Sequence, residues 1–215
     1  MKKMKYLVLL TTLLLLSACS LGETTGEKLS NILTEIYELE SDYREVQPKL
    51  SEMELEEQAN FQSMMELTKD QTDKLTTQVE STAKLLEERL VLVEKEKASI
   101  LKASDKVSGI EALIKETKEE TEKENLKLVE EAFKNRYDSY NNLTKQYTSL
   151  ANLQDELYKM LIAESAEVSS IQEQVVEVNK QNEVVQKEVQ TFNDLTEQLN
   201  EVKEEVFTSL QTKEK

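Results

Sequence analysis

Apolar residues recur at alternating intervals of three and four along most of the chain, which is the spacing by which one face of a helix packs against other helices. The most regular run has its apolar positions at Val168, Ile171, Val175, Val178, Val185, Val189, Phe192, Leu195, Leu199, Val202, Val206 and Leu210. The 215 residues include only three glycines and one proline, so turn-forming residues are scarce. The sequence therefore predicts an all-α fold in which long helices cover one another's apolar stripes.

The repeat divides into four segments of similar length. They run over residues 27–67, 75–114, 126–161 and 168–210, separated by polar stretches at 68–73, 116–124 and 164–167. Each segment of about 40 residues would form a helix about 60 Å long. Because short connections force neighbouring helices to run antiparallel, we expect an elongated up-and-down four-helix bundle with coiled-coil-like packing. The alternative is a three-helix bundle in which the second and third segments fuse through Lys115–Asn125 into one very long helix.

Several residues mark expected irregularities and helix starts. Pro48 lies inside the first segment, and because proline removes a backbone donor we expect a kink or short break just before it. Gly109 is expected to soften the second segment. Thr121 and Glu124 have the spacing of a capping box, which predicts the start of the third helix, and Ser165 is the expected N-cap of the fourth.

The first 20 residues have the features of an export signal. Lysines at positions 2, 3 and 5 precede the apolar run Tyr6–Leu16, and this run ends in Leu16-Ser17-Ala18-Cys19. The last four residues resemble the lipobox of bacterial lipoproteins. The resemblance implies a diacylglyceryl group on the Cys19 thiol, removal of residues 1–18 as a signal peptide, and an N-acyl chain on the new terminus. As a helix the apolar run would span about 16 Å against about 30 Å of hydrocarbon, so an uncleaved transmembrane anchor is the weaker interpretation.

On this interpretation residues 19–26 form a lipidated N-terminus and tether, and residues 27–215 form the helical bundle domain. The processed chain would hold 24 basic and 43 acidic residues, a net charge of −19. This charge argues against nucleic acid as a partner, since no surplus of lysine and arginine is left to neutralise phosphates, and against lying flat on anionic lipid. We therefore expect attachment to the extracytoplasmic face of the cell membrane through the lipid anchor.

The residues needed for most enzymatic chemistry are missing. The chain has no histidine, and its one cysteine is assigned to the lipid. Histidine is the most frequent general base and transition-metal ligand, and no glycine-rich phosphate loop or nucleophile elbow is present. A packed helical rod also offers no obvious concave pocket. We therefore expect no catalytic activity, no metal site and no cofactor apart from the lipid on Cys19.

One stretch of the third segment is rich in aromatic residues. Arg136, Tyr137, Tyr140 and Tyr147 are the candidates for a ligand-facing surface, because tyrosine rings on a ridge can stack on sugar rings. The competing and favoured interpretation is that these tyrosines pack their rings in the core and let their hydroxyls reach polar partners.

Polar residues interrupt the apolar stripes elsewhere. Gln154 and Asn182 occupy core slots, where an amide usually sets the register of the helices. The acidic runs 54–57 and 116–124 lack the spaced ligands and glycine of a calcium loop. We expect both runs to be solvated.

Three motifs carry a family resemblance in the helical part. They are Lys95–Ile100, Arg136–Tyr140 and Glu156–Leu161, and an early Gln47-Pro48 agrees in order. With these motifs the chain resembles the YkyA-type lipoproteins of Gram-positive bacilli, for which cell-wall binding is the proposed role. The resemblance implies an elongated helical bundle on the outer membrane face that binds peptidoglycan or another wall polymer, and it implies no catalytic residues. The alternative is an interaction scaffold for another envelope protein, either membrane-bound or secreted.

Overall fold

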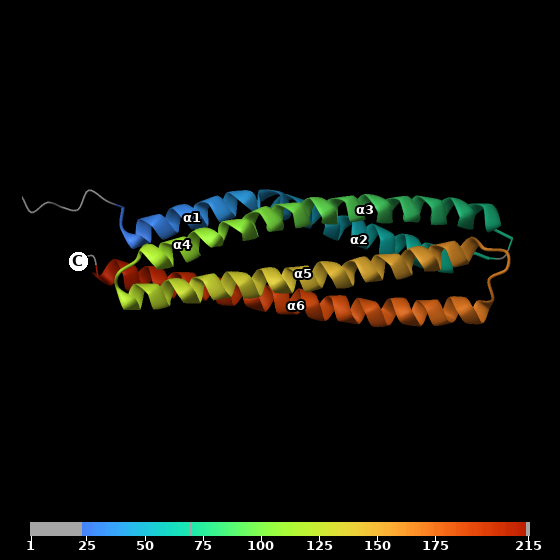
Figure 1. The fold of residues 1–215 in the computed structure, drawn as a ribbon. Helices are drawn as coiled ribbons and strands as arrows, with labels where there is room; N and C mark the ends of the chain where they lie inside the picture. The colour runs from blue at the N-terminus through green and yellow to red at the C-terminus, as the bar shows by residue number, and fades with distance from the viewer. Residues whose placement is uncertain (1–22, 69, 214–215) are drawn as a thin grey trace, which may run out of the picture.

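The computed structural model describes residues 23–68 and 70–213, and nearly all of them are helical. The helices are α1 (Thr25–Leu39), α2 (Ser41–Met65), α3 (Thr72–Lys106), α4 (Ser108–Glu116), α5 (Glu120–Ile162) and α6 (Val168–Lys213). Figure 1 shows four antiparallel arms, formed by α1 with α2, by α3 with α4, by α5 and by α6. The division between α3 and α4 falls at Val107, two residues before Gly109. The predicted up-and-down helical bundle is therefore confirmed.

The connection between the second and third arms decides between four helices and three. Thr117 has extended backbone angles (φ −66°, ψ 137°) and ends α4. Its amide and its hydroxyl both donate to the carbonyl oxygen of Leu113, at 2.9 and 2.8 Å, and the side chain is buried. The extended ψ of Thr117 turns the chain out of the helix, so the three-helix alternative is wrong.

The first arm is interrupted at Glu40, between α1 and α2, and not at Pro48, which lies inside α2. The cause is Ser99 of α3, whose hydroxyl donates to the carbonyl of Leu39 at 2.6 Å and accepts from the amide of Tyr43 at 3.3 Å. In a regular helix this carbonyl and this amide would bond to each other. A side chain inserted into the backbone ladder interrupts a helix, so the break expected near the proline is corrected to Glu40.

Two of the predicted helix starts are also corrected. α5 begins at Glu120 without a side-chain cap, so the capping box expected from Thr121 does not start it. Ser165 lies in the turn before α6 and not at its N-cap position. A capping box forms instead at the beginning of α1, where the Thr24 hydroxyl accepts from the Glu27 amide (3.1 Å) and the Glu27 carboxylate accepts from the Thr24 amide (2.8 Å). α1 therefore starts two residues earlier than predicted.

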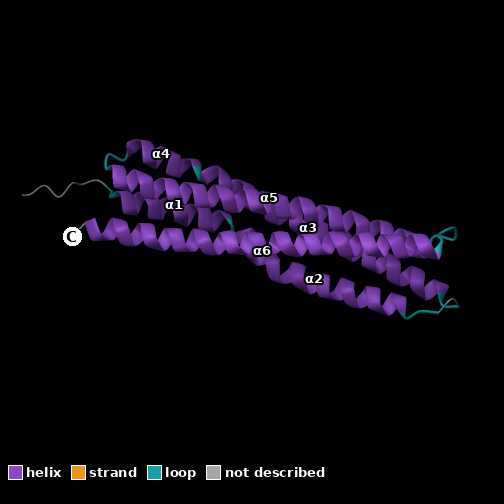
Figure 2. Cartoon of the chain, turned by 90° about the horizontal axis from the view of Figure 1, so that it is seen from below, coloured by secondary structure: helices purple, strands orange, loops and turns teal. Residues whose placement is uncertain are grey.

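The buried core changes along the rod. At the end where α1 begins and α6 finishes, one large cluster draws on α1, α3, α4, α5 and α6, and it includes Leu29, Ile36, Ile100, Ile110, Leu126, Phe133, Tyr140, Phe192, Leu199 and Val206. In the other half, two small clusters join α2, α3 and α5, and no described residue of α6 belongs to them. α6 packs mainly on α5 there, and Figure 2 shows α2 diverging from α6.

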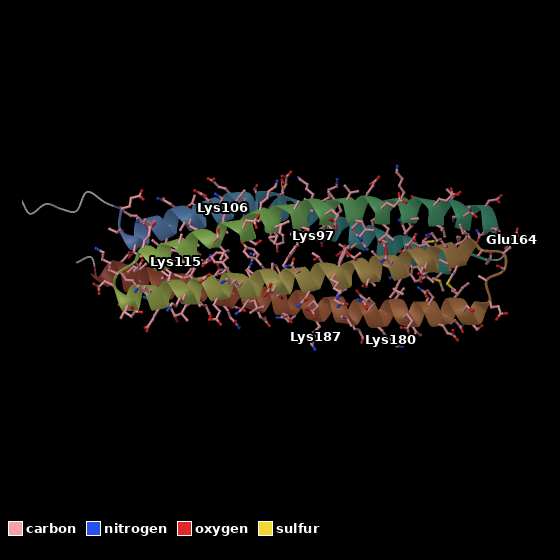
Figure 3. All side chains as sticks on the ribbon, in the orientation of Figure 1. Lys97, Lys106, Lys115, Glu164, Lys180 and Lys187 are labelled. Atoms are coloured by element: carbon pink, nitrogen blue, oxygen red, sulfur yellow. The ribbon has the colours of Figure 1, made fainter. Side chains whose placement is uncertain are left out.

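Charged side chains cover the outside of the rod, and Figure 3 shows examples such as Lys180 and Lys187 projecting from α6. Some of these charges form exposed ion pairs, including Lys106 with Glu35 at 2.8 Å. Exposed pairs of this kind contribute about 0–1 kcal/mol each. The stability of the fold therefore rests on the buried clusters, and the surface charge serves mainly to keep the rod solvated.

Candidate functional site

An open groove lies between α2 and α6 in the half of the rod remote from the beginning of α1. Its volume is about 930 Å³, and the contact between α3 and α5 closes it at the back. On α6 it is lined by Val175, Val178, Asn182, Val185 and Val189, which are consecutive core positions of the heptad pattern. The groove is thus the interior of a four-helix bundle that has not closed, and the expectation that the rod has no concave pocket is wrong.

Exposed polar residues account for the open groove. Glu54 of α2 and Asn182 of α6 line it, and Asn182 occupies a slot that an apolar residue would fill in a closed bundle. Bringing the two helices together would remove these groups from water, which costs about 1–3 kcal/mol for each group left without a partner. In the other half of the rod α6 presents Phe192 and Leu199, and the bundle closes over them. Asn182, predicted to set register from a core slot, is exposed in the groove.

A buried ion pair lines the groove. Arg89 Nη1 lies 2.8 Å from Glu57 Oε2, with side-chain exposures of 4% and 3%. The Tyr158 hydroxyl donates to Glu57 Oε1 at 2.6 Å, and Arg89 Nη2 donates to Gln154 Oε1 at 2.8 Å. The guanidinium carbon is 5.2 Å from the centroid of the Tyr147 ring. This cluster joins α2, α3 and α5, and Gln154 takes part in it as an acceptor for Arg89.

A second buried carboxylate, Glu96 of α3, lies further along the groove. It accepts hydrogen bonds from the Tyr140 hydroxyl at 2.7 Å and from Gln47 Nε2 at 2.8 Å. Burial raises the pKa of the Glu96 carboxyl, and the two hydrogen bonds only partly oppose this. Burial also raises the pKa of Glu57, although Arg89 and the Tyr158 hydroxyl favour its charged form. The groove therefore has two carboxyl groups that bind a proton more readily in the folded state than in the unfolded chain.

Mild acidification is expected to stabilise the fold. Because the pKa values of Glu57 and Glu96 in the folded state lie above the unfolded value of 4.5, their contribution is greatest below the unfolded pKa and is lost as the pH rises through the folded pKa. The melting temperature should be higher at about pH 5 than at about pH 7.5. The variant Glu96→Gln should reduce the difference, and a lower melting temperature at the acidic pH would contradict the prediction.

A separate polar cluster lies in the closed half, at the break in the first arm. Arg136 forms two hydrogen bonds to the Glu40 carboxylate, at 2.6 and 3.3 Å, and its Nε donates to Thr196 Oγ1 at 3.1 Å. The Tyr137 hydroxyl donates to the same carboxylate at 2.7 Å. The guanidinium carbon also lies 5.0 Å from the centroid of the Phe192 ring. This cluster joins the α1–α2 break to α5 and α6.

The residues predicted to face a ligand are divided between the core and the groove. Arg136, Tyr137 and Tyr140 are 4%, 5% and 0% exposed, so they are packed inside the bundle and do not form a ligand-facing surface. Their hydroxyl and guanidinium groups find buried carboxylate partners, which is the physical reason that they can be buried. Tyr147 is half-buried and lines the groove, where its hydroxyl donates to Glu54 Oε1 at 2.6 Å.

Sequence reasoning missed the charged residues of the groove. Arg89 and Glu96 fill two slots of the α3 stripe that lack an apolar residue, and both are buried. The acidic run 54–57 was predicted to be solvated, which is wrong for Glu57 because it is 2% exposed. Oppositely charged residues in core slots of neighbouring helices were the available signal for a buried ion pair.

Cys19 and the preceding leader lie outside the described residues, so the lipobox remains a prediction. Across residues 23–68 and 70–213, no helix is both long enough and apolar enough to cross a bilayer. In the same ranges, no three histidine, cysteine, aspartate or glutamate side chains gather closely enough to hold a metal ion.

Comparison with known proteins identifies the family. Residues 24–209 match the YkyA family, described as "Putative cell-wall binding lipoprotein". The chain belongs to this family. An uncharacterized lipoprotein YkyA from Bacillus subtilis (strain 168) is 25% identical over 194 residues, which cover 90% of this chain and 86% of the relative. The resemblance read from the three sequence motifs is confirmed, and the chain is a lipoprotein of the YkyA kind.

A solved structure has a fold similar to that of this chain. A crystal structure of a conserved Staphylococcus aureus protein of unknown function aligns with a TM-score of 0.68 and 17% sequence identity. The alignment covers 86% of this chain and 96% of the other. At this level of identity the likeness supports the elongated helical fold and says nothing about the ligand.

Proposed function

We propose that this protein is a lipid-anchored, non-catalytic receptor that holds a cell-wall polymer in the groove between α2 and α6. The observation that carries the proposal is the position of this groove in the half of the rod remote from the beginning of α1. From Thr25 to the first groove residue, Gln47, the first arm extends about 33 Å. A receptor tethered through its N-terminus would thus present its binding site away from the bilayer, toward the wall.

The residues of the groove support binding without catalysis. The buried carboxylates Glu57 and Glu96 are held by hydrogen bonds from within the protein, and the chain has no histidine to act as a general base near them. The remaining lining is mostly apolar side chains and amides. Such a surface offers contacts and hydrogen bonds along a polymer and lacks an activated nucleophile or a proton relay.

Wall binding is tested by sedimentation of the purified helical domain with isolated Gram-positive cell walls. The domain should co-sediment with walls at physiological ionic strength, while a helical protein of matched length and negative charge should stay in the supernatant. Zymography on a peptidoglycan gel should show no clearing. Retention no greater than that of the control would reject wall binding, and a cleared zone would reject the non-catalytic role.

The anchor is tested separately, in the intact precursor in a Gram-positive host. The wild-type chain should incorporate a clickable palmitate analogue, and Cys19→Ala should incorporate none, because Cys19 is the only cysteine. Mass spectrometry of the wild-type protein should find residue 19 as the modified N-terminus. A wild-type protein that retains its leader and carries no lipid would contradict the proposed attachment.

A further inference from the structure

We propose that the groove between α2 and α6 binds the peptide part of the wall polymer, as an extended chain that carries free amino groups. The proposal rests on the wall-binding function above and names the component of the wall that occupies the site. It commits to peptide in preference to glycan or anionic polymer, and each choice follows from a property of the groove.

The length of the groove suits an extended chain. The groove follows α2 from Gln47 to Gln62, which is about 23 Å of helix. An extended peptide rises about 3.3 Å per residue, so about six or seven residues would span the same length. The groove is therefore long enough to hold a short extended peptide.

Amide side chains along both edges favour a peptide. Gln58 and Gln62 of α2 and Asn179, Asn182 and Gln186 of α6 all line the groove and are exposed. Each amide offers two donor hydrogens and an acceptor oxygen, as required to pair with the N–H and C=O groups of an extended backbone. The valines of α6 lie between these amides and provide apolar contacts for the side chains of the bound chain.

The charge of the groove favours free amino groups on the ligand. Its lining holds three carboxylates, Glu54, Glu57 and Glu96, and one cation, Arg89. Glu57 is already paired with Arg89, whereas Glu54 is exposed and accepts a hydrogen bond from the Tyr147 hydroxyl at 2.6 Å. An ammonium group brings three donors to such a carboxylate. Anionic wall polymers would instead be repelled.

The aromatic residues of the groove are unsuited to stacking on sugar rings. Tyr158 is 3% exposed, and the Arg89 guanidinium lies over the Tyr147 ring at 5.2 Å. Phe61 packs against the small core cluster of α2, α3 and α5.

Competition experiments test the choice of peptide. Isolated walls are digested with an amidase, and the released peptides and the glycan strands are separated. The peptides should displace the domain from intact walls and the glycan strands should not. Acetylation of the peptide amino groups should weaken displacement by about five- to tenfold. This factor corresponds to the loss of one partly exposed, charged hydrogen bond between a ligand ammonium group and Glu54.

Variants of the groove provide the matched controls. Glu54→Gln removes the charge but keeps an acceptor for Tyr147, and it should weaken peptide binding by about the same five- to tenfold factor. Glu52→Gln makes the same change on the same helix outside the groove and should leave binding unchanged. Asn182→Trp should fill the groove and abolish binding, with circular dichroism showing that the fold is kept.

The outcomes separate this inference from the proposed function. Displacement by glycan strands, or equal displacement by acetylated and free peptides, would overturn the inference while leaving wall binding intact. If the Asn182→Trp domain sediments with walls as well as the wild-type domain does, the groove is not the surface that binds walls. A domain that never sediments with walls would reject both proposals.

Discussion

Replacing Arg136 with methionine is expected to lower the free energy of unfolding by about 3–5 kcal/mol, because it leaves a buried carboxylate without its cation. The Arg136 and Glu40 side chains are 5% and 12% exposed, and their closest contact is 2.6 Å. Methionine keeps much of the apolar contact with Phe192, so the loss reports mainly on the unpaired charge. Urea denaturation followed by circular dichroism measures the change.

The double variant Glu40→Gln with Arg136→Met is the control. With the carboxylate neutralised, most of the lost stability should return, since a buried ion pair can often be replaced without a net cost. Glutamine also keeps an acceptor for the Tyr137 hydroxyl. Exposed ion pairs contribute less than about 1 kcal/mol. A loss of unfolding free energy this small in Arg136→Met would show that the Arg136–Glu40 pair is solvated and not buried.

Replacing Tyr140 with alanine is expected to cost about 3–5 kcal/mol, as for other large aromatic residues removed from a core. Tyr140 has no exposed surface, and its ring meets the edges of Tyr43 and Phe192 at centroid distances of 5.9 and 5.6 Å. Its hydroxyl also donates to the buried Glu96. The substitution would therefore leave both a cavity and a carboxylate with one hydrogen bond fewer.

Two further substitutions separate these contributions. Tyr140→Phe keeps the ring and should cost about 1–3 kcal/mol, the penalty for a buried acceptor that loses its donor. Tyr37→Ala removes a tyrosine that is 62% exposed and should cost less than about 1 kcal/mol. Equal losses from Tyr37→Ala and Tyr140→Ala would show that the closed half of the rod is not the packed core described here.

The break in the first arm illustrates where sequence reasoning reaches its limit. The proline rule placed the kink near Pro48, because proline is the strongest local disruptor of a helix. The structure places it at Glu40, where the hydroxyl of Ser99 bridges the backbone of the arm and where Arg136 holds the Glu40 carboxylate. Neither contact could be predicted from the local sequence, since both partners come from other arms.

The groove shows the same limit for the candidate site. The sequence pattern places Gln154 and Asn182 in core slots and predicts a solvated acidic run at 54–57, but it does not indicate which residues they meet. The structure makes Glu57 part of a buried ion pair, uses Gln154 as an acceptor for Arg89, and leaves Asn182 exposed. A polar residue in a core slot is buried where a hydrogen-bonding partner faces it and stays exposed where none does, because an unpartnered polar group is costly to bury.

The sequence by itself determined the all-α class and the elongated bundle of long antiparallel helices, and it left three or four helices open. These follow from the local period of the apolar residues and the lengths of the segments, which any folded state of the chain must satisfy. Only the tertiary structure decided where the arms are interrupted, which charges are buried and where the bundle stays open. These depend on pairs such as Arg136 with Glu40 and Tyr158 with Glu57, which lie 96 and 101 residues apart and meet only when the arms are packed.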